Sequence, residues 1–335
     1  MSFLGKKLHI TILMLLARPA LAMQELTTRQ QSSAGNPIIA PTVFIHGLNC
    51  TPHDMQPLVD HVHELSPQTP VLNVCLPKKG WAGLKTLKNA LKEQVQADPR
   101  FAAGCNVICH SIGGVVTRFA IEENDMPPVL TYCSLGTPQR GIEHLPADSD
   151  VLIDALLYRY WRIHPFETLE SKLARLACLQ LIQNESSVAN ILHKPSQEAY
   201  YKACMLLAKI NNETDHPDAQ RYKENFTKIG HVICLAGLLD TMVEPAVSTH
   251  WAYYRMDGSN KVLEPIEVAP MYSALGIDQL KNRGAFEVVG VYATHAGMRT
   301  DKEIFLKHIA PALTHESEKK AFLQSRQSPI DHPEQ

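Results

Sequence analysis

The chain has 335 residues, of which 45% are hydrophobic and 20% charged, and its formal net charge is −2. This composition is typical of a globular protein with a sizeable core, and the length fits one large domain or two ordinary ones. The near-neutral charge and the lack of any Lys/Arg run give no electrostatic basis for binding nucleic acid, so we exclude that class of partner.

Residues 1–22 have the pattern of a secretory signal peptide. Lys6 and Lys7 precede an apolar run over residues 8–16, and Ala20-Leu21-Ala22 is a small-x-small cleavage site. The run is too short to span a bilayer and no later stretch approaches that length, so we expect no transmembrane anchor. We expect a secreted protein, periplasmic or extracellular in a bacterium and lysosomal in a eukaryote. A polar linker over residues 23–40 follows.

Strand-like and helix-like runs then alternate along the chain. We expect strands over residues 42–45, 70–76, 106–109, 129–135, 231–239 and 286–292. We expect helices over residues 54–65, 84–95, 112–123 and 302–313, where apolar residues recur at helical spacing. Strands that are apolar on both faces and alternate with helices predict an α/β fold, a mostly parallel sheet flanked by helices.

The pattern changes between residues 139 and 228, where helical segments dominate and no strong strand is visible. We interpret this stretch as a helical, lid-like insertion within a single domain over residues 41–315. Residues 316–335 form a polar tail.

Ser111 lies in Cys109-His110-Ser111-Ile112-Gly113-Gly114, directly between an expected strand and an expected helix. In the nucleophile elbow of α/β-hydrolases a strained turn at this place lifts the serine hydroxyl above the sheet, and its neighbours must be small. Gly113 and Cys109 meet that need. A serine that only caps the helix is the alternative, but the strand-to-helix context favours a nucleophile.

A serine nucleophile needs a base, and in this fold the chain order is Ser, then an acid, then His. Asp240 closes the late strand-like run, and His295 follows the last one. We therefore predict a triad of Ser111, Asp240 and His295. Glu244 is the rival acid and His250 the rival base.

The oxyanion of the transition state needs two backbone donors. We expect them to be the N–H groups of Ile112, directly after the nucleophile, and of Leu48, in the loop after the first strand. Gly47 allows that loop to turn toward the serine, and His46 is interpreted as structural. No Cys-x-x-Cys or His-x-x-x-His pair supports a metal site, and His61 and His63 would face different sides of a helix, so no metal or cofactor is expected.

Eight cysteines could form disulfides in an exported protein. Cys178 and Cys204 are the pair that we expect first. Four others lie inside apolar strand-like runs, where a buried free thiol is the alternative: Cys75, Cys109, Cys133 and Cys234.

Taken together, these motifs resemble the palmitoyl-protein thioesterase family, nearest to its second, lysosomal branch. The resemblance covers residues 41–313, and its matching segments are residues 43–47, 106–114, 206–213, 215–217, 222–240 and 250–254. It places Ser111, Asp240 and His295 on the family's triad and Leu48 and Ile112 on its oxyanion donors. It implies an α/β-hydrolase that cleaves long-chain acyl thioesters, either S-acylated cysteine or acyl-CoA.

The chain departs from the family pattern at three places in the site region, one of which is a short match around His295 that needs a gap. Ile112 stands where the family usually has Gln, and Ile191-Leu192-His193-Lys194-Pro195 replaces an aromatic Tyr-Trp-His-Asp-Pro segment. An acyl groove could come from four apolar residues of the insertion, which could equally form the insertion's own core: Leu152, Leu156, Leu157 and Trp161. An oxygen-ester lipase and an inactive lipid-binding module remain as alternative functions.

Overall fold

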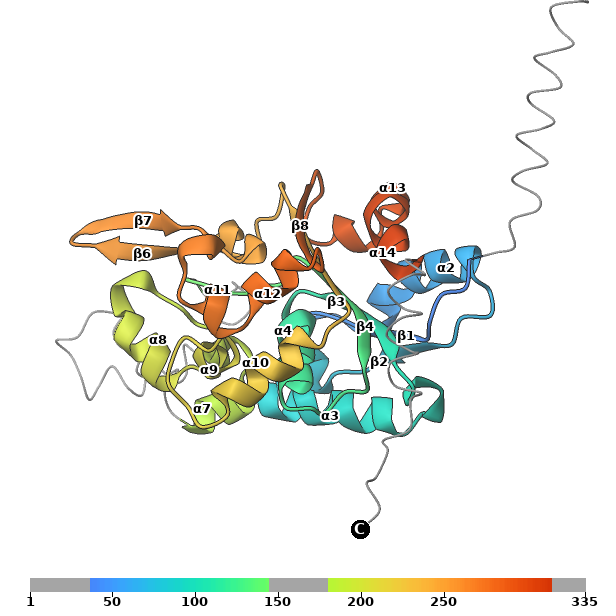
Figure 1. Ribbon diagram of the computed structural model, residues 1–335, viewed down its shortest axis with the longest axis horizontal. Helices are drawn as coiled ribbons and strands as arrows, with labels where there is room; N and C mark the ends of the chain where they lie inside the picture. Colours follow the sequence, from blue (N-terminus) through green and yellow to red (C-terminus); the bar gives the residue numbers. More distant parts are fainter. Residues whose placement is uncertain (1–36, 145–179, 315–335) are drawn as a thin grey trace, which may run out of the picture. The chain divides into compact units, whose positions relative to one another are not determined.

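The computed structural model describes residues 37–144 and 180–314, and the statements below refer to these residues. Their centre is a six-stranded sheet in the order β2-β1-β3-β4-β5-β8, in which every pair of neighbours is parallel (Figure 1). The strands are β1 (Thr42–Ile45), β2 (Val71–Val74), β3 (Cys105–His110), β4 (Val129–Leu135), β5 (His231–Gly237) and β8 (Phe286–Val291). All six coincide with strand-like runs of the sequence, and the α/β-hydrolase fold is confirmed.

Three interior strands of the sheet are mostly apolar because both of their faces are covered. β3 and β4 are buried at every position and β5 at all but its first. The edge strand β8 is more exposed. Side chains alternate between two core clusters, so that Val43 lies in one cluster with Leu87, while Phe44 lies in the other with Leu58.

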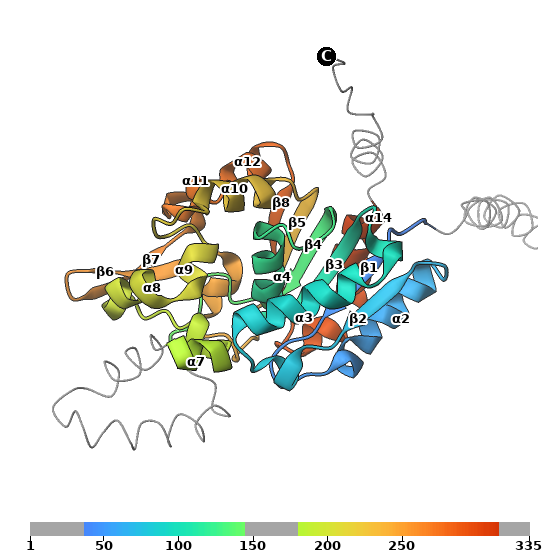
Figure 2. The same ribbon diagram turned by 90° about the horizontal axis from the view of Figure 1, so that it is seen from below.

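Helices form both outer layers. One layer contains α3 (Leu84–Gln96) and α4 (Ile112–Glu122), which lie side by side (Figure 2). The other layer contains α2 (Gln56–Leu65) and the C-terminal helices. The one-turn helix η1 (Pro52–Met55) directly precedes α2. The C-terminal run is divided into α13 (Lys302–Ile304), a π-helix (Phe305–Ile309) and α14 (Ala310–Thr314). The wide turn ends two residues before Pro311, whose missing N–H interrupts regular α-helical bonding.

Between β4 and β5 the described residues form helices and turns, with α7 (Gln180–Glu185), α8 (Glu198–Cys204), α9 (Leu206–Ile210) and α10 (Ala219–Thr227). A single bridge pairs Ile142 with Leu192. The residues considered for an acyl groove, 152–161, lie outside the described residues, as do the predicted signal peptide and polar tail.

Sequence patterns did not predict a second, two-stranded sheet after β5. The strands β6 (Tyr253–Asp257) and β7 (Asn260–Glu264) form an antiparallel hairpin beside α8 (Figures 1 and 2). Gly258 adopts a φ of 61° in its two-residue turn. The helices α11 (Met271–Ala274) and α12 (Ile277–Asn282) lead from the hairpin to β8.

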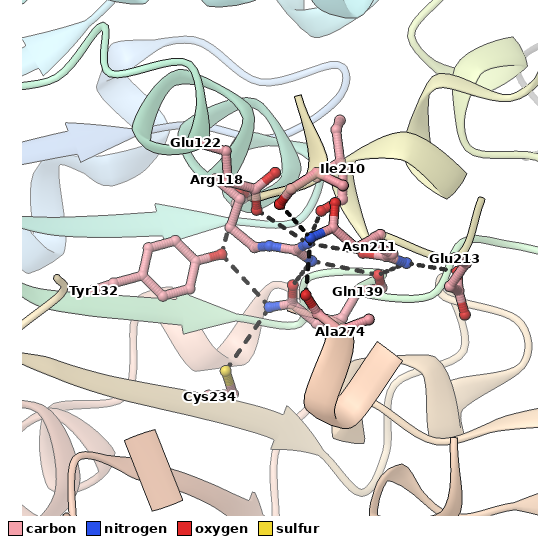
Figure 3. A network of polar contacts seen from close by, with 12 residues as sticks. Arg118, Glu122, Tyr132, Gln139, Ile210, Asn211, Glu213, Cys234 and Ala274 are labelled. Atoms are coloured by element: carbon pink, nitrogen blue, oxygen red, sulfur yellow. Dashed lines mark hydrogen bonds and ion pairs between the residues drawn. The ribbon is translucent and has the colours of Figure 1, made fainter. Parts of the chain in front are cut away.

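A buried arginine joins the helix behind Ser111 to distant parts of the chain. Figure 3 shows the Arg118 guanidinium of α4 at the centre of a polar network. It donates to Oε1 of Gln139 at 2.9 Å and to Oδ1 of Asn211 at 2.7 Å, and it lies 4.5 Å from the ring centroid of Trp251. Asn211 and Trp251 belong to segments that carry the family resemblance. Because these partners come from three separate loops, the network fixes those loops relative to α4.

Candidate active site

Ser111 occupies a strained turn between β3 and α4. Its backbone angles, φ 54° and ψ −129°, are rarely adopted by a residue with a side chain. The turn is held by a hydrogen bond from the Ser111 N–H to the Leu135 carbonyl at 2.9 Å. Glycine is required two positions later, since a Cβ on Gly113 would lie 2.6 Å from the His46 carbonyl oxygen. This geometry matches the elbow expected from the sequence and leaves Ser111 partly exposed.

Asp240 and His295 meet at the carboxyl ends of β5 and β8. Nδ1 of His295 lies 2.6 Å from Oδ2 of Asp240, whose side chain is fully buried. The other carboxylate oxygen accepts the backbone N–H groups of Met242 at 2.8 Å and Val243 at 3.2 Å. The carboxylate is therefore held in one orientation and keeps the proton of the imidazole on Nδ1. Nε2 of His295 is left as an acceptor, as a general base requires.

Glu244 and His250, the alternative acid and base, do not form the pair that Asp240 and His295 form. Glu244 is 68% exposed and is 3.9 Å from Nε2 of His144. His250 ends the one-turn helix η7 (Ala246–His250), where burial lowers its pKa. The structure thus brings Asp240, and not Glu244, to His295.

The loop after β1 packs against Ser111. A Cβ on Gly47 would lie 2.8 Å from Cβ of Ser111, so only glycine allows this approach. Leu48 follows it, and Ile112 begins α4, where the first N–H groups have no partner within the helix. Ile112 thus adjoins Ser111 in the chain, and Leu48 adjoins the glycine that packs against Ser111, while their role as oxyanion donors stays a prediction.

His46 fixes the peptide that carries the Leu48 N–H. Nε2 of His46 accepts the N–H of Leu76 at 3.0 Å, so Nδ1 carries the proton and donates it to the Gly47 carbonyl at 2.8 Å. Burial lowers the pKa of His46, which keeps the ring neutral. Because a trans peptide points its C=O and N–H in opposite directions, this bond also sets the direction of the Leu48 N–H. The structural role expected of His46 thus has a definite geometry.

The structure places one more histidine at the site, which sequence reasoning treated only as part of the Ser111 motif. The ring of His110 lies 4.5 Å from that of His295, and its Nε2 is 3.0 Å from the His295 carbonyl oxygen. In the sequence, only the position of His110 next to Ser111 indicated that this histidine could lie at the site.

The divergent segment after α7 packs into the protein interior. His193 lies between the rings of Tyr201 and Tyr253, with centroid separations of 3.6 and 4.1 Å. Its Nε2 is 2.8 Å from Oε2 of Glu198. This segment therefore supports the helices between β4 and β5.

The described residues also place the cysteines and the side chains that could bind a metal ion. The seven cysteines there are free thiols, and Cys178, the expected partner of Cys204, lies outside them. Cys75 is exposed, whereas Cys109, Cys133 and Cys234 are buried. Across residues 37–144 and 180–314 no group of three or more His, Cys, Asp or Glu side chains is placed to hold a metal ion.

The family model for palmitoyl protein thioesterase matches residues 41–295. The chain belongs to this family. It is 28% identical over 286 residues to the lysosomal thioesterase PPT2 of Rattus norvegicus, covering 82% of this chain and 88% of the relative. Palmitoyl-protein thioesterase 3 of Dictyostelium discoideum is 29% identical over 238 residues, covering 70% of this chain and 76% of that protein.

Among solved structures, the mature lipase BlEst2 of Bacillus licheniformis is 17% identical to this chain, with a TM-score of 0.44. The match covers 84% of this chain and 95% of the lipase chain. Membership of the palmitoyl protein thioesterase family makes the chain a hydrolase of thioesters or esters. The resemblance expected from the sequence is confirmed.

Proposed function

We propose that the chain is a serine thioesterase that hydrolyses long-chain acyl thioesters through an acyl-Ser111 intermediate. The observation that carries this proposal is the hydrogen bond between Asp240 and His295, two residues 55 positions apart whose chain order after Ser111 is that of the hydrolase triad.

In the first step Oγ of Ser111 attacks the thioester carbonyl carbon, and Nε2 of His295 takes its proton. The N–H groups of Leu48 and Ile112 donate to the oxyanion that forms. The carbon–sulfur bond then breaks, the thiol leaves with the proton from His295, and the acyl group stays on Ser111. A water molecule that gives one proton to His295 attacks this ester. The second oxyanion then collapses, the bond from the acyl carbon to Oγ of Ser111 breaks, and His295 returns the proton to Oγ as the fatty acid leaves.

Exposed apolar side chains beside the acid and the base support an apolar acyl group. Leu238 is 61% exposed, Met242 59% and Tyr292 80%, and all three lie within three residues of Asp240 or His295. The N–H of Leu238 donates to the Val291 carbonyl at 2.8 Å, which brings the two chain segments together. Long-chain acyl groups would cover this apolar surface, which is otherwise in contact with water.

The compartment belongs to the same proposal. The relatives carry the name lysosomal thioesterase, and the sequence predicts a signal peptide, so we place the enzyme in the secretory pathway or outside the cytoplasm. Within the described residues no helix is long and apolar enough to cross a membrane. N-terminal sequencing of the exported protein should find a new terminus at residue 23.

The test compares a palmitoyl thioester with the matched oxygen ester on the purified enzyme. We expect faster turnover of the thioester, complete loss in Ser111→Ala, and labelling of wild type but not Ser111→Ala by a fluorophosphonate. Ser273→Ala, a change at an exposed serine, is the matched control. Faster turnover of the oxygen ester would favour a lipase, and an unlabelled wild type would favour an inactive lipid-binding module.

A further inference from the structure

Among residues 37–144 and 180–314, the buried ring of His110 has one hydrogen bond, which goes to the backbone of His295. Only 2% of the residue is exposed, and Nε2 lies 3.0 Å from the His295 carbonyl oxygen. Since a carbonyl can only accept, Nε2 must carry the proton. Nδ1 is then an acceptor, and it has no partner within the described residues. The fold therefore keeps a polar ring inside the protein with a single polar contact.

That contact joins two elements of unequal rigidity. His110 ends β3, a fully buried strand that is paired on both sides, by β1 and β4. His295 lies in an irregular loop between β8 and the one-turn helix η9 (Gly297–Arg299). Loops vary in position more than central strands do. Because His110 is covalently bonded to Ser111, a bond from its ring to this loop ties the loop to the serine itself.

The ring of His295 is confined on several sides. Asp240 holds Nδ1, and a Cβ on Gly136 would lie 2.9 Å from the same atom. The ring of His110 lies 4.5 Å away at an interplanar angle of 55°. The carboxylate sets the tautomer of His295, but it comes from the β5 loop and does not fix the distance to β3. Arg299 also ties the chain after His295 to the segment after β1, through a hydrogen bond to the Asp54 carbonyl at 3.2 Å. His110 adds a direct bond between the backbone of His295 and the residue next to Ser111.

We propose that His110 is a positioning residue, whose Nε2–H holds the backbone of His295 at the distance from Ser111 that proton transfer requires. This inference rests on the proposed function, in which His295 is the base. Burial lowers the pKa of His110 well below its usual value. The ring therefore remains neutral while His295, its neighbour, takes up the serine proton.

The test separates the hydrogen bond from the bulk of the ring. His110→Met fills the space without a donor, whereas His110→Gln places an amide N–H near the position of Nε2. Because a displacement of about 1 Å can cost ~10²-fold in rate, we expect His110→Met to lower kcat ~10²-fold with little change in KM. We expect His110→Gln to recover most of that loss, and His308→Gln, a change in the C-terminal π-helix, to match wild type.

The readout is the rate of Ser111 labelling by a fluorophosphonate, measured beside thioester turnover, because labelling needs the Ser111–His295 pair but no particular substrate. Labelling of His110→Met at the wild-type rate would overturn the inference, as would a His110→Gln variant as slow as His110→Met. If His110→Met does not fold, His110→Asn replaces it, since its shorter amide cannot reach the carbonyl. Failure of wild type to label would instead refute the proposed function.

Discussion

Replacing Asp240 by Asn should preserve the shape of the site while reversing the tautomer of His295. Oδ1 of Asp240 accepts two backbone N–H groups, from Met242 and Val243. An asparagine must keep its oxygen at that position, because the flipped amide would set its NH₂ against two donors. Its Nδ2 would then face Nδ1 of His295 at the place where Oδ2 now lies, 2.6 Å away. The imidazole must accept there, so its proton moves to Nε2 and Ser111 loses its base.

The loss in kcat should approach that of a catalytic triad whose histidine cannot accept the serine proton. A wrong histidine tautomer lowers kcat by about 10⁴-fold in hydrolases of this kind, or ~5 kcal/mol of transition-state stabilisation. We expect a loss of this order in kcat for a palmitoyl thioester, with KM and the urea midpoint near wild type. Pre-steady-state measurement of thiol release would show the loss in acylation.

Glu244→Gln is the matched control, since it makes the same chemical change four residues further on. Its exposed carboxylate has no contact with His295, so its activity should equal that of wild type. Near-normal activity of Asp240→Asn together with a severe loss in Glu244→Gln would refute this reasoning and reassign the acid.

Three further predictions concern the protein around the site. Gly114→Ala should lower the free energy of unfolding by about 1–3 kcal/mol in urea titrations, because its Cβ would lie 2.1 Å from Oγ1 of Thr137. Gly290→Ala, with 3.4 Å to its nearest atom, should not. Burial raises the pKa of Glu122 to about 8 from 4.5, so the unfolded chain loses this proton first and stability should fall as the pH rises between those values. Glu122→Gln should flatten that part of the stability profile. Iodoacetamide should alkylate Cys75 in the native protein, and mass spectrometry should find four other thiols modified only after unfolding: Cys105, Cys109, Cys133 and Cys234.

The sheet and the pairing of Asp240 with His295 were predictable because their signals are local. Buried parallel strands read as continuous apolar runs, and β3, β4 and β5 are buried on both faces. The fold then fixes the order in which acid and base follow the serine, which was enough to select Asp240 and His295.

The hairpin was missed because its strands are largely exposed and show little apolar alternation. The two-residue turn Gly258-Ser259 was the available signal, since this dipeptide favours a tight hairpin. A charged residue in an apolar helix gives no such signal. Arg118 is fully buried because Gln139, Asn211 and Trp251 surround it, and these partners come together only in the folded chain. The bond from His110 to His295 spans 185 residues and was equally hidden.

The strand order has a consequence for how the enzyme is made. β3, β4, β5 and β8 are adjacent in the same order in which the ribosome releases them, so the sheet can grow by adding each new strand at one edge. The strand before Ser111 emerges early, whereas β8 and the histidine loop after it emerge near the end of synthesis. A partly made chain therefore contains Ser111, the proposed nucleophile, without His295, the proposed base. Hydrolytic activity should appear only when the final strand has docked, which makes turnover a direct report of completed folding.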